Sequence, residues 1–213
     1  RAFRDIDEAD FKTLLQTVGA FTKKIKKGGY ITLADEEVPC VSVILKGTVH
    51  MMSEDIWGNR SILVFMNRGD LFGESFACSS NQVSLVNFYA DVTALYIPFD
   101  KLLSLSANDL GAYRQLVQNI MTLVADKNVR ILQKLEIVSK RNLRDKLMAY
   151  FSYMAKVWGS MEFDVPLGRV ALSEYLCVDR SALTRELSRM QDDGLIEFEK
   201  NHFKILAPAD SLT

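Results

Sequence analysis

The spacing of hydrophobic and polar positions changes along the chain. After an amphipathic helix predicted over residues 7–17, short apolar stretches alternate with polar turns from about residue 24 to residue 97. Turn signals lie between them at 28–29, 46–47, 57–59 and 68–70. Many short strands at roughly even spacing predict a small β-barrel or jelly roll. The strand-like stretches are 30–33, 41–45, 49–52, 61–66, 83–88 and 92–97.

Apolar residues at 3,4 spacing then predict one long helix over residues 108–138, with Asn108 or Asp109 as its N-cap. About four heptads of mainly apolar seam, in a helix that joins two domains, favour a homodimeric coiled coil over packing on its own domain alone. Two lysines weaken this seam toward its C-terminal half. The seam consists of Leu110, Tyr113, Val117, Ile120, Val124, Lys127, Ile131, Lys134 and Val138.

The rest of the chain predicts shorter helices followed by a two-stranded hairpin. The helices are expected over 141–157, 170–176 and 180–191, and the strands over 195–198 and 203–206. Helix, turn, helix and hairpin in this order are typical of a winged helix-turn-helix. We therefore predict an α+β protein with a β-roll effector domain (1–107), a dimerisation helix (108–138) and a winged helix-turn-helix domain (139–213).

The predicted helix from residue 180 has the features of a DNA-recognition helix. Asp179 is placed to cap it by accepting from the backbone N–H of Ala182. Polar residues in the first turns of such a helix reach base edges in the major groove, where arginine suits guanine and phosphate. Because the preceding helix, the turn and the hairpin occur together, a solvated surface helix is the weaker reading. The polar residues are Arg180, Ser181, Thr184 and Arg185.

Two segments carry a family resemblance over essentially the whole chain. Residues 178–187, followed by Asp193-Gly194-Leu195-Ile196, resemble the C-terminal domain of the Crp/Fnr family of bacterial transcription regulators. Residues 69–75 (GDLFGES) resemble the signature turn of that family's cyclic-nucleotide-binding-like β-roll. The resemblance implies a homodimer on a pseudo-palindromic operator in double-stranded DNA, with RNA polymerase as a further partner. It implies DNA contacts at Arg169, Arg180, Ser181, Thr184 and Arg185.

Two positions depart from the family pattern. Many members carry Glu at the position of Ser181, where it accepts from a cytosine amino group, and serine cannot discriminate in that way. The family's commonest half-site is therefore in doubt. Cys177 lies in the turn where glycine is usual, so a left-handed backbone is expected there at some cost.

The effector is not identified by the resemblance. Cyclic-nucleotide-binding relatives place an Arg ten residues after the Gly-Glu pair, followed by Ser or Thr, whereas counting from Glu74 gives Ser84 and then Leu85. Residues 75–89 hold no Lys or Arg, and burying a phosphate without a cation is costly. We therefore expect a small, poorly charged effector other than cyclic AMP, or none. A cyclic-nucleotide-responsive regulator stays an alternative.

The resemblance and the turn together define a candidate effector pocket between the β-roll and the long helix. It is expected to be apolar and uncharged, with Phe76 and Val86 as further walls. Its predicted residues are Phe72, Gly73, Glu74, Ser75, Ser84, Leu85 and Asn128.

Redox and haem sensing have little support. Cys40, Cys78 and Cys177 are too few and too far apart for an iron–sulfur cluster, and their spread favours free thiols in a reducing cytoplasm. His50 has the opposite strand parity to its apolar neighbours, so a surface histidine is favoured over a haem ligand. No cofactor or metal is predicted, and a haem-based gas or redox sensor stays an alternative. His202 is a candidate phosphate contact at the wing tip.

Composition limits the remaining classes. With two histidines, no P-loop and no metal cluster, an enzyme is not predicted, and no apolar run approaches the ~18 residues needed to span a bilayer. The chain opens with Arg1, which is consistent with missing native N-terminal residues. The formal net charge is −1, with a pI of about 6.2, and residues 139–213 balance 11 basic against 11 acidic side chains. A DNA-binding domain of this composition depends on where its arginines lie rather than on their number.

Overall fold

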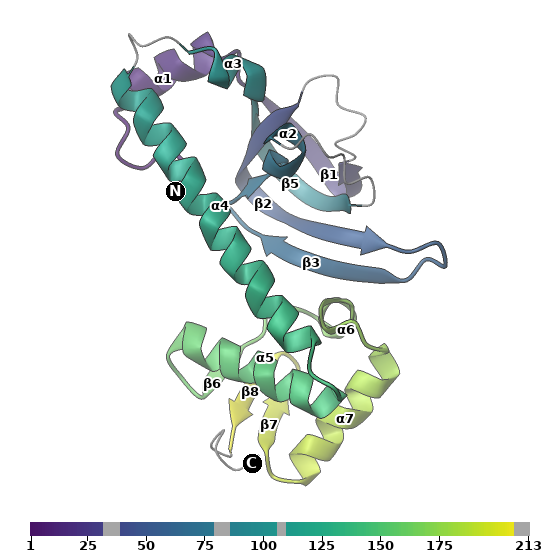
Figure 1. Cartoon of the computed structure of the whole chain (residues 1–213). Helices are drawn as coiled ribbons and strands as arrows, with labels where there is room; N and C mark the ends of the chain where they lie inside the picture. Colours follow the sequence, from purple (N-terminus) through teal and green to yellow (C-terminus); the bar gives the residue numbers. More distant parts are fainter. Residues whose placement is uncertain (32–38, 79–85, 106–109, 207–213) are drawn as a thin grey trace. The chain divides into compact units, whose positions relative to one another are not determined.

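The computed structural model describes residues 1–31, 39–78, 86–105 and 110–206. The chain divides into two compact units, Arg1–Ile131 and Leu132–Thr213. Both are seen in Figure 1, and the boundary between them falls inside the longest helix, α4 (Leu110–Val138).

The first unit is built on an antiparallel five-stranded sheet (Figure 1). Its strand order is β1-β5-β2-β3, and β4 pairs with β2. The helices α1 (Glu8–Thr17), α2 (Glu74–Cys78) and α3 (Phe99–Leu103) accompany it, together with the N-terminal part of α4. The strands are β1 (Phe21–Ile31), β2 (Cys40–Glu54), β3 (Arg60–Met66), β4 (Leu71–Phe72) and β5 (Val86–Pro98).

Strand β2 separates two hydrophobic cores because side chains alternate across a strand. Cys40 and Ile44 point into a core that also holds Phe72 and Tyr96. The intervening Val41 and Val43 point to the other face, where they pack with residues of the helices. The helical residues of this second core include Leu14, Leu102, Leu116 and Leu123.

A β-bulge in β2 corrects the predicted strand boundaries. Residues 46–47 were expected to form a turn, but the ladder to β5 runs from Cys40 to Ser53, with a register shift between Ile44 and Lys46. The extra residue reverses the side-chain parity, so Val49 joins Ile44 in the same core. In the described part of β5, residues 86–98 likewise form one strand where two were expected.

The second unit follows the predicted winged helix-turn-helix. Its helices are α5 (Leu143–Trp158), α6 (Arg169–Leu176) and α7 (Arg180–Asp192), and its sheet has the order β6-β8-β7. Asn142 caps α5 by accepting from the N–H of Asp145, which starts the helix. Strand β6 (Glu162–Asp164) was not predicted, whereas β7 (Ile196–Glu199) and β8 (His202–Ile205) form the expected hairpin.

The bulge generates a stability prediction. Gly47 has φ +90°, and a Cβ there would lie 1.9 Å from the carbonyl oxygen of Asp91. Gly47→Ala therefore adds a backbone clash to the strain of a positive φ, and we expect a loss of about 2–5 kcal/mol of unfolding free energy.

The matched control is Gly58→Ala, where φ is +82° but a Cβ meets nothing within 4 Å. We expect about 1 kcal/mol there, from strain alone. Denaturant unfolding of both variants checks the difference, and equal losses would contradict the clash.

Candidate nucleic-acid interface and effector-site region

The first turns of α7 present a polar face outward. The Asp179 Oδ1 atom accepts from the Ala182 N–H at 2.8 Å, as the sequence predicts, and this bond fixes the start of the helix. Arg180, Ser181, Thr184 and Arg185 are all exposed. The opposite face is buried through Leu183, Leu187 and Met190. The arrangement leaves the polar side chains free to meet a ligand while the apolar face holds the helix.

The turn before α7 contains the predicted left-handed residue. Cys177 ends α6 with φ 55° and ψ 52°, and its N–H donates to the Ser173 carbonyl oxygen. A left-handed backbone at a non-glycine residue costs about 1–2 kcal/mol. Apolar burial on the flanking helices offsets this cost, through Leu172 and Leu176 of α6 and Leu183 of α7.

Arg169 lies against the wing rather than on an open face. Its Nη2 atom donates to the Lys200 carbonyl oxygen at 2.8 Å, and its guanidinium lies over the rings of Phe198 and Phe203, 5.1 and 5.2 Å from their centroids. Burial lowers the pKa of Arg169. Arg169 therefore positions the wing turn. Its Nη1 group is buried and donates to no partner among the described residues.

An arginine that was not predicted clamps the recognition helix. Arg144 on α5 donates through Nε to Glu186 Oε1 at 2.6 Å, and its Nη1 atom lies 2.7 Å from Asp193 Oδ2. The hydrogen bond to Glu186 is the main cause of the raised pKa of Arg144. Arg189 Nη1 lies 3.6 Å from Oε2 of the same Glu186. The clamp draws the acidic charge of Glu186 toward α5, away from Arg185.

His202 on β8 is held between two carboxylates of β6. Its Nδ1 atom lies 2.9 Å from Asp164 Oδ1, and its Nε2 atom lies 2.9 Å from Glu162 Oε1. Hydrogen bonding to Asp164 first and Glu162 second raises the pKa of His202. The side chain is therefore occupied within the wing sheet, and its positive form is the one that both neighbours favour.

The structure describes five of the seven predicted effector-pocket residues. Phe72, Gly73 and Glu74 are buried, but Ser75 is exposed. The predicted helix residue Asn128 is also exposed. The side chains of Ser84, Leu85 and Val86 lie outside the described residues.

A buried cation replaces the expected uncharged wall. Lys127, next to Asn128 in α4, points inward, and its Nζ atom lies 2.6 Å from Glu74 Oε1 and 3.4 Å from the Leu71 carbonyl oxygen. Within the described residues, Glu74 Oε2 is buried and accepts no hydrogen bond. Residues 75–89 hold no Lys or Arg, and the cation comes instead from Lys127, more than 50 residues after Glu74 in the sequence.

A second ion pair lies beside the first. Asp70 is buried, and its Oδ2 atom accepts from Arg130 Nη1 at 2.9 Å and from the Asn67 N–H at 3.0 Å. Arg1 reaches the other carboxylate oxygen at 3.4 Å. Asp70 and Glu74 thus join the turn around β4 to α4 within the first unit.

The His50 prediction needs one adjustment. His50 points away from Val49 and Met51, but its ring packs edge-on against Phe65 across the β2–β3 ladder, 4.6 Å between centroids. The resulting burial lowers the pKa of His50. Across the described ranges, no three His, Cys, Asp or Glu side chains gather in a way that could hold a metal ion. Of the described helices, none is long and apolar enough to cross a membrane.

Two cavities lie elsewhere. An apolar one of about 310 Å³ in the second unit is lined by residues that include Met148, Ala155, Met161 and Ile205. A polar one of about 500 Å³ in the first unit lies around Arg68, Asp70 and Arg130. Neither coincides with the recognition helix or with Glu74.

A β-roll with a capped, outward-facing recognition helix in a winged unit defines a DNA-binding transcription regulator, and comparison with known proteins supports this class. Residues 22–109 match the family model of the cyclic nucleotide-binding domain, and residues 145–210 match that of the Crp-like helix-turn-helix domain. The chain belongs to the Crp/Fnr family of transcription regulators.

Among similar curated proteins is the electron transport regulator A of Shewanella oneidensis, 26% identical over 189 residues, which cover 86% of this chain and 74% of that protein. An anaerobic regulatory protein of Aggregatibacter actinomycetemcomitans is 25% identical over 188 residues, covering 86% of this chain and 72% of its own length.

Solved structures show the same fold. The c-di-GMP-responsive global regulator CLP of Xanthomonas campestris matches with a TM-score of 0.74 at 12% identity, over 95% of this chain and all of that one. A regulator of the Crp/Fnr family from Eubacterium rectale matches with a TM-score of 0.62 at 18% identity, over 97% of this chain and 93% of that one.

The wing histidine generates a pH prediction. A folded-state pKa above the unfolded value of about 6.5 stabilises the fold below that pH, and the contribution is lost as pH rises through the folded pKa. With two histidines in the chain, proton NMR can follow both, and we expect His202 to titrate at higher pH than His50.

Asp164→Asn serves as the matched variant. It removes the main cause of the raised pKa, so the His202 midpoint should fall while that of His50 stays unchanged. A His202 midpoint at or below the ordinary value in the unaltered protein would contradict the carboxylate sandwich.

Proposed function

We propose that the chain is a homodimeric, sequence-specific DNA-binding regulator that inserts α7 of each protomer into a major groove. The observation that carries the proposal is the capped first turn of α7, with Arg180, Ser181, Thr184 and Arg185 exposed on it. Two-fold symmetry of the dimer then requires a pseudo-palindromic operator. As a regulator of transcription it would work in the cytoplasm, beside RNA polymerase.

The residues divide between base reading and positioning. Arg180 and Arg185 suit guanine O6 and N7 or phosphate, whereas Ser181 and Thr184 suit phosphate or either base type. Arg169 is held against the wing and its unpartnered Nη1 is buried, so we assign it a positioning role rather than a phosphate contact. Because Ser181 stands where many relatives have Glu, specificity would rest mainly on the two arginines.

The dimer proposal rests on an apolar face of α4. Met121, Val124, Ile131, Leu132 and Leu135 on this helix are all exposed, between 39% and 67% of their surfaces. Met121, Val124, Ile131 and Leu135 follow the 3,4 spacing of a coiled-coil seam, in which Asn128 takes the position between Val124 and Ile131. An exposed stripe of this kind in a soluble unit marks an interaction surface, and a second copy of α4 offers the same stripe.

This seam shares Val124 and Ile131 with the one predicted along the sequence and otherwise differs from it. Tyr113 and Ile120 pack against the core of the first unit, and Lys127 and Lys134 are buried. These four residues belong to the inward face, so the two lysines do not interrupt the proposed dimer seam. Val124 and Ile131 remain on the outward face in both descriptions.

We propose two forms of regulation, one with a small effector and one without. Glu74 Oε2 retains a free acceptor, which a small neutral molecule with a hydroxyl or amide donor could fill. The alternative is regulation without a dissociable effector. The Lys127–Glu74 pair occupies the carboxylate that such a molecule would meet.

DNA binding is tested by substitution on α7. Arg180→Ala and Arg185→Ala should each weaken binding to the protein's own promoter region by about tenfold or more, because a bidentate base contact contributes about 1–3 kcal/mol. Fluorescence anisotropy at fixed salt gives the affinities. Lys156→Ala removes an exposed charge of α5 and is the charge-matched control. Unchanged affinity in both arginine variants would overturn the assignment.

The seam is tested by a matched pair on α4. Val124→Lys places a charge on the proposed seam, whereas Val129→Lys places the same charge on an exposed position outside it. We expect Val124→Lys alone to raise the dimer dissociation constant, by about tenfold or more, since a desolvated unpaired charge is costly at an interface. Sedimentation equilibrium measures both, and equal effects would contradict this seam.

A further inference from the structure

Two ion pairs join α4 to the turn that carries the family signature. Lys127 pairs with Glu74 at 2.6 Å, and Arg130, three residues further along the same helix, pairs with Asp70 at 2.9 Å. Both acids belong to the segment 69–75, and all four residues lie in the first unit. The chain therefore ties its long helix to its signature turn with its own side chains.

The Lys127–Glu74 pair is the buried one. The two side chains keep only 7% and 8% of their exposed surface, whereas Arg130 keeps 29%. A buried carboxylate without a cation is strongly destabilising, because it loses its hydration without compensation. Glu74 therefore requires a positive partner inside this unit, and Lys127 supplies it without any bound molecule.

The pair also sets the rotation of α4 about its own axis. A helix turns about 100° per residue, so with Lys127 held inward Met121 lies about 120° around the axis from it and faces outward. Val124 and Ile131 lie only about 60° and 40° from Lys127, at the edge of the exposed stripe. Those two residues belong to the proposed dimer seam and are exposed in the single chain. Loss of the pair would remove one of the two ion pairs that hold this face of α4 on the signature turn.

We propose that Lys127 is a built-in ligand of the effector site: its ammonium group occupies Glu74 and holds α4 with its seam outward, so that the dimer binds its operator without a dissociable effector. This inference rests on the proposed function and selects the effector-free form of it. The free acceptor at Glu74 Oε2 does not oppose it, because the charge of the carboxylate is already matched by Lys127.

The chemistry of the site supplies a direct probe. Lys127→Ala removes three methylene groups and the ammonium, which together correspond to n-propylammonium. The site formed by Glu74 should accept that free cation in the shortened variant. Lys127→Met fills the same space with an uncharged chain of similar volume, so it should accept none.

The experiment measures operator affinity of the purified full chain with no added small molecule. The unaltered protein should bind, and Lys127→Ala and Lys127→Met should both bind about tenfold or more weakly, a usual size for coupling between sites. Added n-propylammonium chloride should restore Lys127→Ala but not Lys127→Met. Equal concentrations of n-propanol and of sodium chloride are the controls for neutral filling and for salt.

Three results would overturn the inference. One is unchanged operator binding by Lys127→Met. Another is failure of n-propylammonium to restore Lys127→Ala while n-propanol does. The last is an unaltered protein that binds only after addition of cyclic AMP or of a small-molecule cell extract. Arg185→Ala is measured in parallel. It tests DNA contact without changing the Lys127–Glu74 pair, so it distinguishes failure of this inference from failure of the proposed function.

A double variant covers the case in which single substitutions unfold the chain. Glu74→Gln together with Lys127→Met removes both buried charges, which is far less destabilising than leaving one alone. The double variant should unfold cooperatively near the temperature of the unaltered protein and still bind the operator about tenfold or more weakly. Full operator affinity in this folded variant would also overturn the inference.

Discussion

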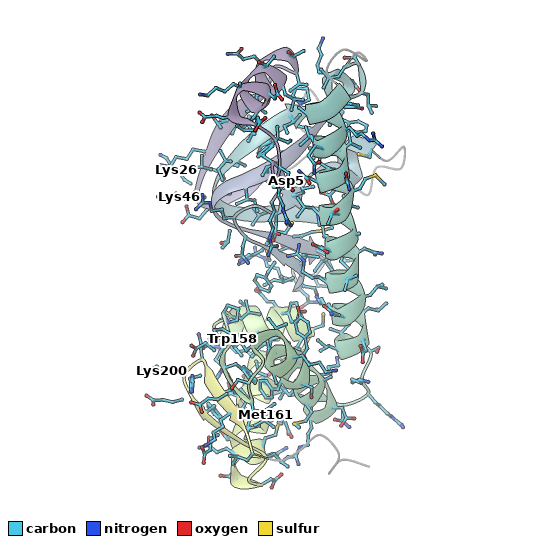
Figure 2. All side chains as sticks on the ribbon, turned by 90° about the vertical axis from the view of Figure 1, so that its left-hand side faces the viewer. Asp5, Lys26, Lys46, Trp158, Met161 and Lys200 are labelled. Atoms are coloured by element: carbon cyan, nitrogen blue, oxygen red, sulfur yellow. The ribbon has the colours of Figure 1, made fainter. Side chains whose placement is uncertain are left out.

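Because an α-helix turns about 100° per residue, α4 can serve two surfaces only if their residues lie on separate faces along its whole length. Leu116, Leu123 and Lys127 lie on one face and are buried within the first unit. Met121, Leu132 and Leu135 lie on another and remain exposed. A small rotation of the helix would exchange these roles. The position of α4 on the β-roll, drawn with its side chains in Figure 2, therefore decides whether a dimer seam exists at all. The buried Lys127–Glu74 pair is one of the polar contacts that fix it, beside Arg130–Asp70.

Charge placement has a similar role in the winged unit. Basic and acidic side chains are equal in number over residues 139–213, so DNA affinity cannot come from bulk charge. Instead, Arg144 pairs with two acidic residues of the recognition helix and its C-terminal end, Glu186 and Asp193. Arg180 and Arg185 are exposed on the outer face. Affinity of this kind depends on geometry and is sensitive to any change in how α7 is held.

The elements set by local signals could be predicted from the sequence. The capping residue Asp179, the apolar face of α7 and the hairpin after Gly194 are short-range patterns, and the structure confirms them. Strand β2 could not be predicted correctly, because the glycine at residue 47 looks like a turn and serves as a bulge. That choice depends on the facing strand, which lies more than 40 residues away.

The polar contacts that organise both units could not be predicted from the sequence either. Lys127 reads as a defect in an apolar seam, and only the fold brings it to Glu74. Arg144 meets Glu186 across 42 residues of sequence, and no periodicity marks such a pair. Arg169 was assigned to phosphate from the resemblance, whereas the wing aromatics and the Lys200 carbonyl oxygen occupy most of its guanidinium. Long-range pairing of charges needs the tertiary structure.

The most direct test of the account is selection of binding sites from a random pool of DNA duplexes by the purified chain. A dimer that places two copies of α7 in successive major grooves predicts enrichment of a two-fold symmetric motif, with half-site centres about 10 bp apart or a multiple of that spacing. Enrichment of a single unpaired half-site, or no enrichment over non-specific binding, would contradict the central claim that this chain reads DNA as a symmetric pair of recognition helices.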